Sequence, residues 1–313
     1  MKSVIAIVCR YMTLKSLLVA AALTILLIFC FIAYIYNHHF SAFVATLPDI
    51  IVEKRTWNNC DNDVSTTKDM SYVLYGEGSA DEETKKHLHS YIRSLTSRQA
   101  PGGVHLSNRS GRQHFSQIGA SQFVDRLLKR RRHGVFIECG AANGEYLSNS
   151  LFFELHRNWT GVLIEGNPEY YRSLLSKNRN AYVVRACLST IPKPQTVSYR
   201  LRNLYSGISN SPSGRLINVH CFPLNDITAA LGIQHVDYLS LDVEGLESNI
   251  LSTIDWSQLT IDVMTVEYNM RVHKLSKLRS LLTANGSFTE VARLPFGRGP
   301  RSGQDVVFMH AVK

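Results

Sequence analysis

The sequence predicts a doubly wound α/β domain with a mostly parallel, seven-stranded sheet, preceded by one transmembrane helix. Two observations carry this prediction. From about residue 117 onward, short apolar strands alternate with amphipathic helices, which is the pattern of a parallel sheet with helices on both faces. Residues 16–36 contain no charged side chain. At the helical rise such a run spans about 31 Å, enough to cross the hydrocarbon core of a bilayer.

The composition is that of a globular protein with additional segments. The chain has 313 residues, 45% of them hydrophobic and 19% charged, with a formal net charge of +9. These values exclude a disordered chain and a disulfide-dense mini-protein. The basic residues are mostly scattered, so nucleic acid is not an expected partner. The one dense basic run, 129–132, is expected to end a helix capped by Gly134; a protease cleavage site is the alternative.

The uncharged run at 16–36 is expected to be a signal-anchor rather than a cleaved signal peptide. It is longer than a signal-peptide core and leads into several aromatic residues, which suit a membrane interface. Residues 1–15 carry basic side chains and no acidic one, which places them in the cytosol. We therefore expect a single-pass type II membrane protein of the endoplasmic reticulum or Golgi, with endosome or plasma membrane as alternatives. A buried core helix is the other interpretation of this run.

The rest of the chain is expected to be lumenal and to have two parts. Residues 37–116 are predicted to be a stem, because they contain few apolar periods and their last twenty or so residues are polar and rich in Gly, Ser and Arg. Within this stem we expect at most a short helix, near 81–95. Residues 117–313 are predicted to form the α/β domain.

The elements of the domain follow one another in a regular order. A helix opens it, because Ile118, Phe123, Leu127 and Leu128 fall on one helical face. Strands are expected where short apolar runs are bounded by turn residues: 134–139, 161–165, 181–188, 237–242, 260–267, 287–293 and 305–311. Helices are expected between them, at 145–157, 168–179, 224–231, 246–253 and 271–284.

A ligand site is expected at the carboxyl ends of the central strands, where doubly wound sheets bind their ligands. At the end of the first strand lie Glu138 and then a turn with Gly140 and Gly144; the glycines allow a tight turn and close approach of the backbone. Glu165 ends the second strand, where a carboxylate can accept both hydroxyls of a ribose. These residues predict a nucleotide-type cofactor.

The spacing of the glycines favours one cofactor over another. A dinucleotide site prefers G-x-G-x-x-G, whereas this turn reads E-x-G-x-x-x-G and lacks the middle glycine that lets a pyrophosphate approach. S-adenosylmethionine (SAM) has no pyrophosphate, and Glu138 could hold the amino group of its methionine part. Asp242 and Glu244 follow the strand expected beside the first and complete the site. Turn glycines with carboxylates nearby by chance are the alternative interpretation.

Several segments of the chain resemble the FkbM family of methyltransferase domains, and in particular its membrane-anchored animal branch, which includes the insect protein Star. They are FIECGAANGEYLSNSLFFE, NWTGVLIEGNPEYY, ACLS, LSLDVEGLE, VMTVEYN and QDVVF. The resemblance covers roughly residues 117–313. It implies a seven-stranded SAM-dependent methyltransferase fold and an enzyme that methylates a hydroxyl of a sugar or another acceptor.

The resemblance also implies roles for individual residues. It assigns cofactor binding to Glu138, Gly140, Gly144 and Glu165, and the D-x-E-G motif to Asp242 and Glu244. Asp242 is the expected base that takes the hydroxyl proton, with Glu244, Glu267 and His273 as other candidates. No metal is expected, because the cysteines form no C-x-x-C pair and the histidines have no ligand spacing.

Two other functions stay open at this point. The resemblance to Star implies a non-catalytic escort that moves a membrane-bound growth factor precursor from the endoplasmic reticulum to the Golgi by vesicle transport. A lumenal enzyme would need SAM to be carried across a membrane, which counts against turnover, while the intact glycine turn counts for cofactor binding. A NAD-dependent oxidoreductase is disfavoured by the glycine spacing. The expected partners are a membrane, a membrane-protein cargo, and a small-molecule or glycan acceptor.

The cysteines and glycosylation sequons complete the predictions. Cys139 lies inside the first strand and is expected to be a buried apolar residue. Cys60, Cys139, Cys187 and Cys221 would all lie in an oxidising lumen and allow three complete pairings; the pair Cys187–Cys221 is favoured among them, because both residues are expected to border the same side of the crevice. In a lumenal glycoprotein, N-linked sugars are expected at the N-x-S/T sequons Asn108, Asn158 and Asn285.

Overall fold

The computed structural model describes residues 81–98, 103–107, 113–209, 211–268, 275–295 and 304–311. These residues all belong to one compact unit, Val64–Lys313. The predicted tail 1–15, the predicted span 16–36 and most of the predicted stem 37–116 lie outside the described residues.

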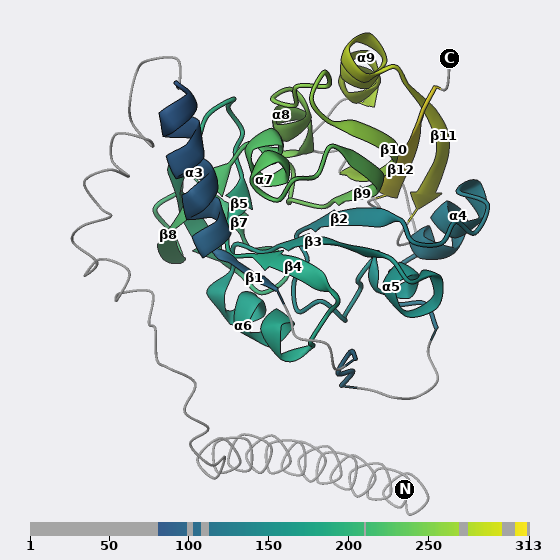
Figure 1. The fold of residues 1–313 in the computed structure, drawn as a ribbon, viewed down its shortest axis with the longest axis horizontal. Coiled ribbons are helices and arrows are strands. Elements are labelled where there is room, and N and C mark those ends of the chain that lie inside the picture. Colours follow the sequence, from purple (N-terminus) through teal and green to yellow (C-terminus); the bar gives the residue numbers. More distant parts are fainter. Residues whose placement is uncertain are drawn as a thin grey trace, which may run out of the picture. The chain divides into compact units, whose positions relative to one another are not determined.

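The main sheet has eight strands in the order β1-β4-β3-β2-β9-β10-β12-β11 (Figure 1). Its strands are β1 (Thr96–Arg98), β2 (Val135–Cys139), β3 (Thr160–Ile164), β4 (Ala181–Val184), β9 (His235–Leu241), β10 (Thr260–Tyr268), β11 (Phe288–Pro295) and β12 (Gln304–His310). The five strands from β4 to β10 are parallel, whereas β1, β12 and β11 pair antiparallel with their neighbours. The predicted mostly parallel, seven-stranded sheet was therefore wrong: the sheet is mixed and has one more strand.

The additional strand comes from the segment expected to be a stem. Helix α3 (Glu82–Ser94) precedes β1, and Leu88, Ile92 and Leu95 are buried in the main core. Their spacing places them on one helical face, and the cap residue Asp81 accepts a hydrogen bond from the backbone N–H of Thr84 at 2.7 Å. A short helix was expected here, but its packing against the domain was not.

Helices cover both faces of the main sheet (Figure 1). One face packs against α3, α7 (Leu224–Ala230), α8 (Glu247–Leu251) and α9 (Leu275–Gly286), and the other against α4 (Ala120–Leu127), α5 (Leu151–Arg157) and α6 (Pro168–Ser176). Successive residues of β2 alternate between the two cores: Phe136 packs on the α5 side and Ile137 on the α7 side. The central strands are therefore buried on both faces, which explains their continuous apolar runs.

A second sheet of four strands was not predicted. It contains β5 (Cys187–Leu188), β6 (Gln195–Leu201), β7 (Gly207–Ile208) and β8 (Arg215–Phe222), in the order β5-β8-β6-β7. Cys187 and Cys221 face each other in the register of β5 and β8 and form a disulfide, which confirms the predicted pair. Cys139 is buried, as predicted, and its thiol is free.

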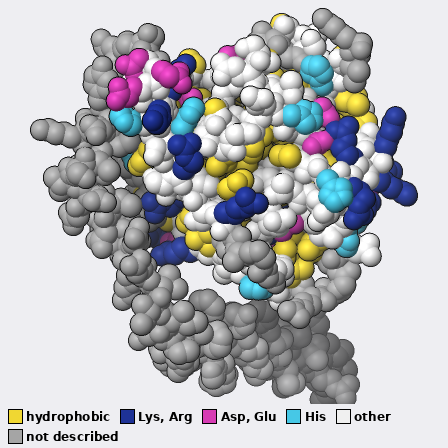
Figure 2. All heavy atoms as spheres, viewed as in Figure 1, with side chains coloured by type: hydrophobic (Ala, Val, Ile, Leu, Met, Phe, Trp, Pro, Cys, Tyr) yellow, Lys and Arg dark blue, Asp and Glu magenta, His cyan; other side chains and the backbone are white. Residues whose placement is uncertain are grey.

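The dense basic run directly follows α4. Its residues are exposed, and Lys and Arg side chains gather at the right edge of Figure 2. Lys129 and Arg130 adopt positive φ angles of 52° and 57°, so the helix ends there rather than at Gly134. Arg131 pairs with Asp237 and, at 2.6 Å, with Asp262, which ties the run to the starts of β9 and β10.

Within the described residues, no helix is both long and apolar enough to cross a membrane. This finding corrects the expected transmembrane helix and the expected single-pass type II localisation; the run 16–36 itself lies outside the described residues. Of the sequons, Asn108 and the side chain of Asn285 also lie outside them. Asn158 ends α5, next to the fully buried Trp159.

Candidate functional site

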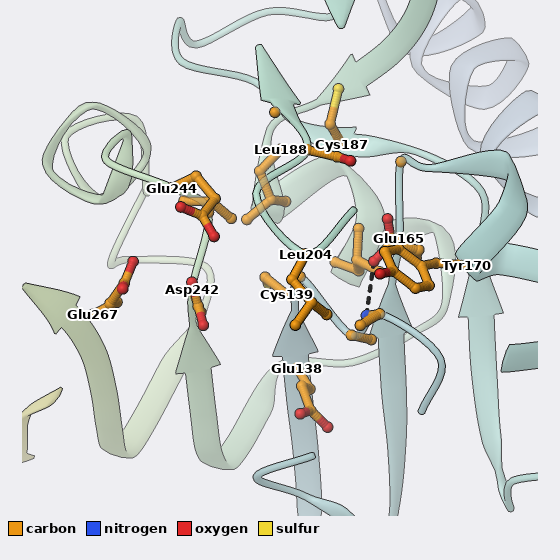
Figure 3. A pocket seen from close by; sticks show the side chains of 18 of the residues that line it. Glu138, Cys139, Glu165, Tyr170, Cys187, Leu188, Leu204, Asp242, Glu244 and Glu267 are labelled. Carbon is orange, nitrogen blue, oxygen red and sulfur yellow. Dashed lines mark hydrogen bonds between the residues drawn. The ribbon is translucent and has the colours of Figure 1, made fainter. Parts of the chain in front are cut away.

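A pocket of about 180 Å³ lies at the carboxyl ends of β2, β3, β9 and β10, and loops of the small sheet line it as well (Figure 3). Sequence reasoning placed a site at these strand ends. The pocket is lined by five of the six predicted site residues: Glu138, Gly140, Glu165, Asp242 and Glu244. Gly144 is not among the lining residues. Of the two further base candidates, Glu267 lines the pocket and His273 lies outside the described residues.

The two glycines of the turn are needed for different reasons. Gly140 has φ +77°, and a Cβ atom there would lie 2.0 Å from the backbone oxygen of Asp242. Gly144 has φ +72°, and a Cβ atom there would lie 2.2 Å from Cδ1 of Leu174 in α6. Gly140 thus lets the turn after β2 pack directly against the end of β9, while Gly144 lets it pack against a helix.

Glu138 shapes the wall of the pocket. Its buried carboxylate accepts hydrogen bonds from Ser148 Oγ and the Asn149 N–H, both at 2.8 Å, and from the N–H and hydroxyl of Ser150. These donors come from the loop that leads into α5. They use most of the acceptor capacity of the carboxylate. The structure therefore brings Glu138 to the pocket, but with its oxygens directed to this loop.

Glu165 joins the turns that follow β2 and β3. Its carboxylate accepts hydrogen bonds from the N–H groups of Ala142 at 2.8 Å and Asn167 at 2.6 Å; Figure 3 marks the first. Burial raises the pKa of Glu165 to about 7, and these hydrogen bonds oppose the rise. The carboxylate is thus fixed in place at the pocket and changes its charge near neutral pH.

A group of carboxylates lies at the other end of the pocket. Leu241 of β9 pairs with Val266 of β10, so the next residues, Asp242 and Glu267, are neighbours at the strand ends (Figure 3). Each offers an oxygen within 4.8 Å of the other and of Glu247, a spacing that could also hold a metal ion.

The pKa values of this group are raised. Asp242 has surface open to the pocket, but protein atoms surround its carboxyl group on the other sides. This desolvation, followed by the nearby charge of Glu267, raises the pKa of Asp242 well above its usual value. Desolvation also raises the pKa of Glu244 and of Glu267 to about 7. Because the carboxyl oxygens of Asp242 and Glu267 lie within 4.8 Å of each other, the two groups titrate as a coupled pair rather than independently.

The turn between β6 and β7 borders the pocket from the small sheet. Ser206 stabilises this turn: its hydroxyl oxygen accepts hydrogen bonds from the Arg202 N–H at 2.8 Å and from Asn167 Nδ2 at 3.1 Å. Leu204 and Tyr205 of this turn line the pocket although they are 39% and 67% exposed. Exposed apolar side chains around a pocket mark a ligand-binding surface. Sequence reasoning missed these two residues because it missed the small sheet.

The charged residues that line the pocket are all acidic. Among the described lining residues there is no Lys, Arg or His. A pocket of this kind attracts cations and repels phosphate and carboxylate groups, since its apolar walls strengthen the field of the acids.

Comparison with known proteins gives one family match. Residues 138–288 match the family model of the methyltransferase FkbM domain. The match supports the predicted FkbM resemblance for this stretch and does not extend to the membrane-anchored Star-like branch. No curated protein sequence matches the chain.

Several solved structures are similar to the chain. Magnesium protoporphyrin IX methyltransferase from Synechocystis PCC 6803, with bound SAM, has 10% identity and a TM-score of 0.37, over 81% of this chain and 96% of that chain. The human methyltransferase 10 domain containing protein has 12% identity and a TM-score of 0.38, over 74% and 100%. The METTL16 methyltransferase domain has 13% identity and a TM-score of 0.40, over 80% and 91%. These values are too low to carry an assignment of function.

Proposed function

We propose that this chain, whose residues 138–288 match the methyltransferase FkbM domain, is a SAM-dependent enzyme that transfers a methyl group to a hydroxyl of a small-molecule or glycan acceptor. The observation that carries the proposal is the pocket at the strand ends. It combines the Gly140 turn, the buried Glu165 and the neighbouring carboxyls of Asp242 and Glu267.

The first part of the proposal is the cofactor. SAM carries a positive sulfonium and a positive amino group, which suit a pocket whose charged lining residues are all acids. The Gly140 turn presents backbone to the cofactor, and Glu165 accepts the ribose hydroxyls. The family match agrees with the SAM cofactor expected from the sequence. Glu138 contributes by holding the wall between β2 and α5.

The second part is the chemistry. Bound SAM would supply a methyl carbon for attack by the acceptor oxygen, and S-adenosylhomocysteine would be the leaving group that keeps the electron pair of the broken carbon–sulfur bond. The acceptor's hydroxyl proton goes to the carboxyl pair of Asp242 and Glu267, which lie together at the strand ends. Glu244, beside them, has a pKa of about 7 and contributes to the same acidic surface. The charge of the pocket favours neutral or cationic acceptors over anionic ones.

Calorimetry of the full chain tests the cofactor. We expect binding of SAM and S-adenosylhomocysteine but not of NAD, both in EDTA and in Mg²⁺, because no step above requires a metal. Glu165→Ala should weaken SAM binding by about 1.5–3 kcal/mol, roughly 10- to 150-fold. Glu169→Ala is the matched control, since Glu169 is an exposed acid that pairs with Arg215. NAD binding in place of SAM would contradict the proposal and favour an oxidoreductase.

Methyl transfer from labelled SAM tests the base. The double variant Asp242→Asn/Glu267→Gln should still bind SAM and lose transfer to a panel of hydroxyl acceptors, because the two amides fill the space but neither can take the proton. Within the panel, phosphorylated members should be the poorest acceptors. No SAM binding at millimolar concentration would contradict the cofactor and the mechanism together. Binding without any transfer would favour a non-catalytic protein.

A further inference from the structure

We propose that Glu247, which does not line the pocket, is a positioning residue that holds Asp242 and Glu244 in place. The proposal rests on the methyltransferase function proposed above. Glu247 is the first residue of α8 and is only 1% exposed. It acts on the pocket through the backbone of the turn 242–246, which joins β9 to α8.

The proposal depends on two hydrogen bonds that Glu247 accepts from the turn. One carboxylate oxygen of Glu247, Oε1, accepts hydrogen bonds from the N–H of Val243 at 3.1 Å and from the N–H of Gly245 at 3.0 Å. These two donors flank Glu244, so Glu247 fixes the backbone on both sides of that residue. One buried oxygen that accepts two backbone N–H groups is a directional link, because neither N–H group has water nearby to replace it.

The turn needs such a link because its backbone is strained. Glu244 has φ +59°, a left-handed conformation that a residue with a side chain rarely adopts, and Gly245 follows with φ +98°. Without an anchor Glu244 would relax to a more common conformation. Its side chain would then leave its place beside Gly207 of the small sheet, where a Cβ atom added to the glycine would lie 3.7 Å from Glu244 Cβ.

The same turn controls Asp242. Its N–H donates to Cys139 O at 3.3 Å, and Val243, one of the two residues held by Glu247, follows it directly. A shift of the turn therefore moves Asp242 against Glu267, its neighbour on β10. Figure 3 shows Asp242 and Glu244 close together at the end of β9.

Electrostatic attraction does not explain why Glu247 lies beside the other acids. Its nearby charge raises the pKa values of Asp242, Glu244 and Glu267, so another acid among these carboxyls is unfavourable for stability. Asp305 also faces the pair from β12 and raises the pKa values of Asp242 and Glu267. The geometry of the turn, rather than charge, is what Glu247 supplies.

Two variants separate geometry from charge. Glu247→Gln removes the charge but keeps an oxygen that can accept both N–H groups, whereas Glu247→Ala removes both. In the full chain, amide exchange by NMR should be about fivefold faster or more at Val243 and Gly245 in Glu247→Ala, the effect of losing one ordinary hydrogen bond, and close to wild type in Glu247→Gln.

The second measurement uses SAM labelled with ¹³C in its transferred methyl group. The bound methyl resonance reports the carboxyls around it. Both variants remove the charge of Glu247, so the resonance should shift further in Glu247→Ala, which also frees the turn, than in Glu247→Gln. Asp255→Ala is the matched control: Asp255 accepts the Ser257 N–H at 3.0 Å in an exposed turn, so it should speed exchange at Ser257 and leave the methyl resonance unchanged.

The outcomes are distinct. Unchanged protection of Val243 and Gly245 in Glu247→Ala would overturn the contact itself. Faster exchange in Glu247→Ala with the same methyl resonance in Glu247→Ala and Glu247→Gln would show that Glu247 is only a structural residue and would overturn the positioning role. If wild-type protein binds no SAM, the proposed function fails and the positioning role falls with it, while the exchange data still decide the contact.

Discussion

Gly140 brings together the turn after β2 and the end of β9, and no other residue type fits there. Gly140→Ala should reduce both stability and SAM binding, because the new Cβ would meet the Asp242 oxygen at 2.0 Å. Gly232→Ala is the matched control: it has φ +71° but nothing within 4 Å of a new Cβ. We expect about 1 kcal/mol of destabilisation for the control, from backbone strain alone, and clearly more for Gly140→Ala.

Thermal melts and calorimetry of the two variants check this expectation. Equal melting temperatures for Gly140→Ala and Gly232→Ala would contradict the close approach of the two strand ends. Loss of SAM binding in the control as well would point to a general effect of the substitutions rather than to the pocket.

Single residues also show where sequence reasoning reaches its limit. The positions of Gly140, Glu165 and Asp242 followed from the rule that strand ends meet at one edge of a parallel sheet, and all three line the pocket. The partners of a side chain do not follow from that rule. Glu138 was expected to face the cofactor, but its oxygens accept from Ser148, Asn149 and Ser150, which the sequence suggested were helical.

At the scale of elements, the buried Arg179 links α5 to the glycine turn. It is 0% exposed, pairs with Glu154 of α5 at 2.6 Å, and donates to Gly144 O and to Ser150 Oγ. Arg179→Ala should destabilise the fold by about 3–5 kcal/mol, because it leaves the buried charge of Glu154 unpaired. Urea titrations measure this. Arg215→Ala, which breaks the exposed pair with Glu169, should cost about 0–1 kcal/mol.

The disulfide joins β5 to β8 across a sequence separation of 34 residues. Closing a loop of that length stabilises the folded state by about 4 kcal/mol, because it restricts the unfolded chain. Reduction should therefore lower the melting temperature of wild-type protein. It should have no such effect on a Cys187→Ala/Cys221→Ala double variant. Equal melting of wild-type protein with and without reductant would contradict the prediction.

The elements of the main sheet were predicted better than those of the small sheet, for a physical reason. Strands buried on both faces, such as β2 and β3, are continuous apolar runs that stand out in a sequence. Strand β6, QTVSYRL, alternates polar and apolar residues and is mostly half-buried, so its signal is weaker. The alternation of polar and apolar residues in β6 is visible in the sequence, but no strand was predicted there.

For the whole molecule, five acids with desolvated carboxyl groups, from the buried Glu165 to the more exposed Glu244, determine how stability depends on pH. Asp226 and Asp305 have pKa values of about 6, and Glu165, Glu244 and Glu267 of about 7, all above the usual values because of burial. The folded state thus binds protons more tightly than the unfolded state. The stability these groups provide is complete below about pH 4 and is lost as the pH rises through about 6 to 7.

Unliganded protein should therefore be more stable near pH 5 than near pH 8, as measured by chemical unfolding. Saturating SAM should reduce the difference, because a cation in the pocket favours the ionised carboxylates. Stability that rises steadily from about pH 5 to about pH 8 without SAM would contradict the raised pKa values.

The order of the strands has an evolutionary consequence. The chain leaves the main sheet after β4, builds the small sheet from β5 to β8, and returns through α7 to β9. The segment from β5 to β8, which contributes residues to the pocket wall, can thus change in length or sequence without altering the strand order of the main sheet. Descendants of one ancestral protein can keep the same glycine turn and strand-end acids while this segment diverges, so the wall that the segment contributes to the pocket can evolve faster than the wall that the main sheet contributes.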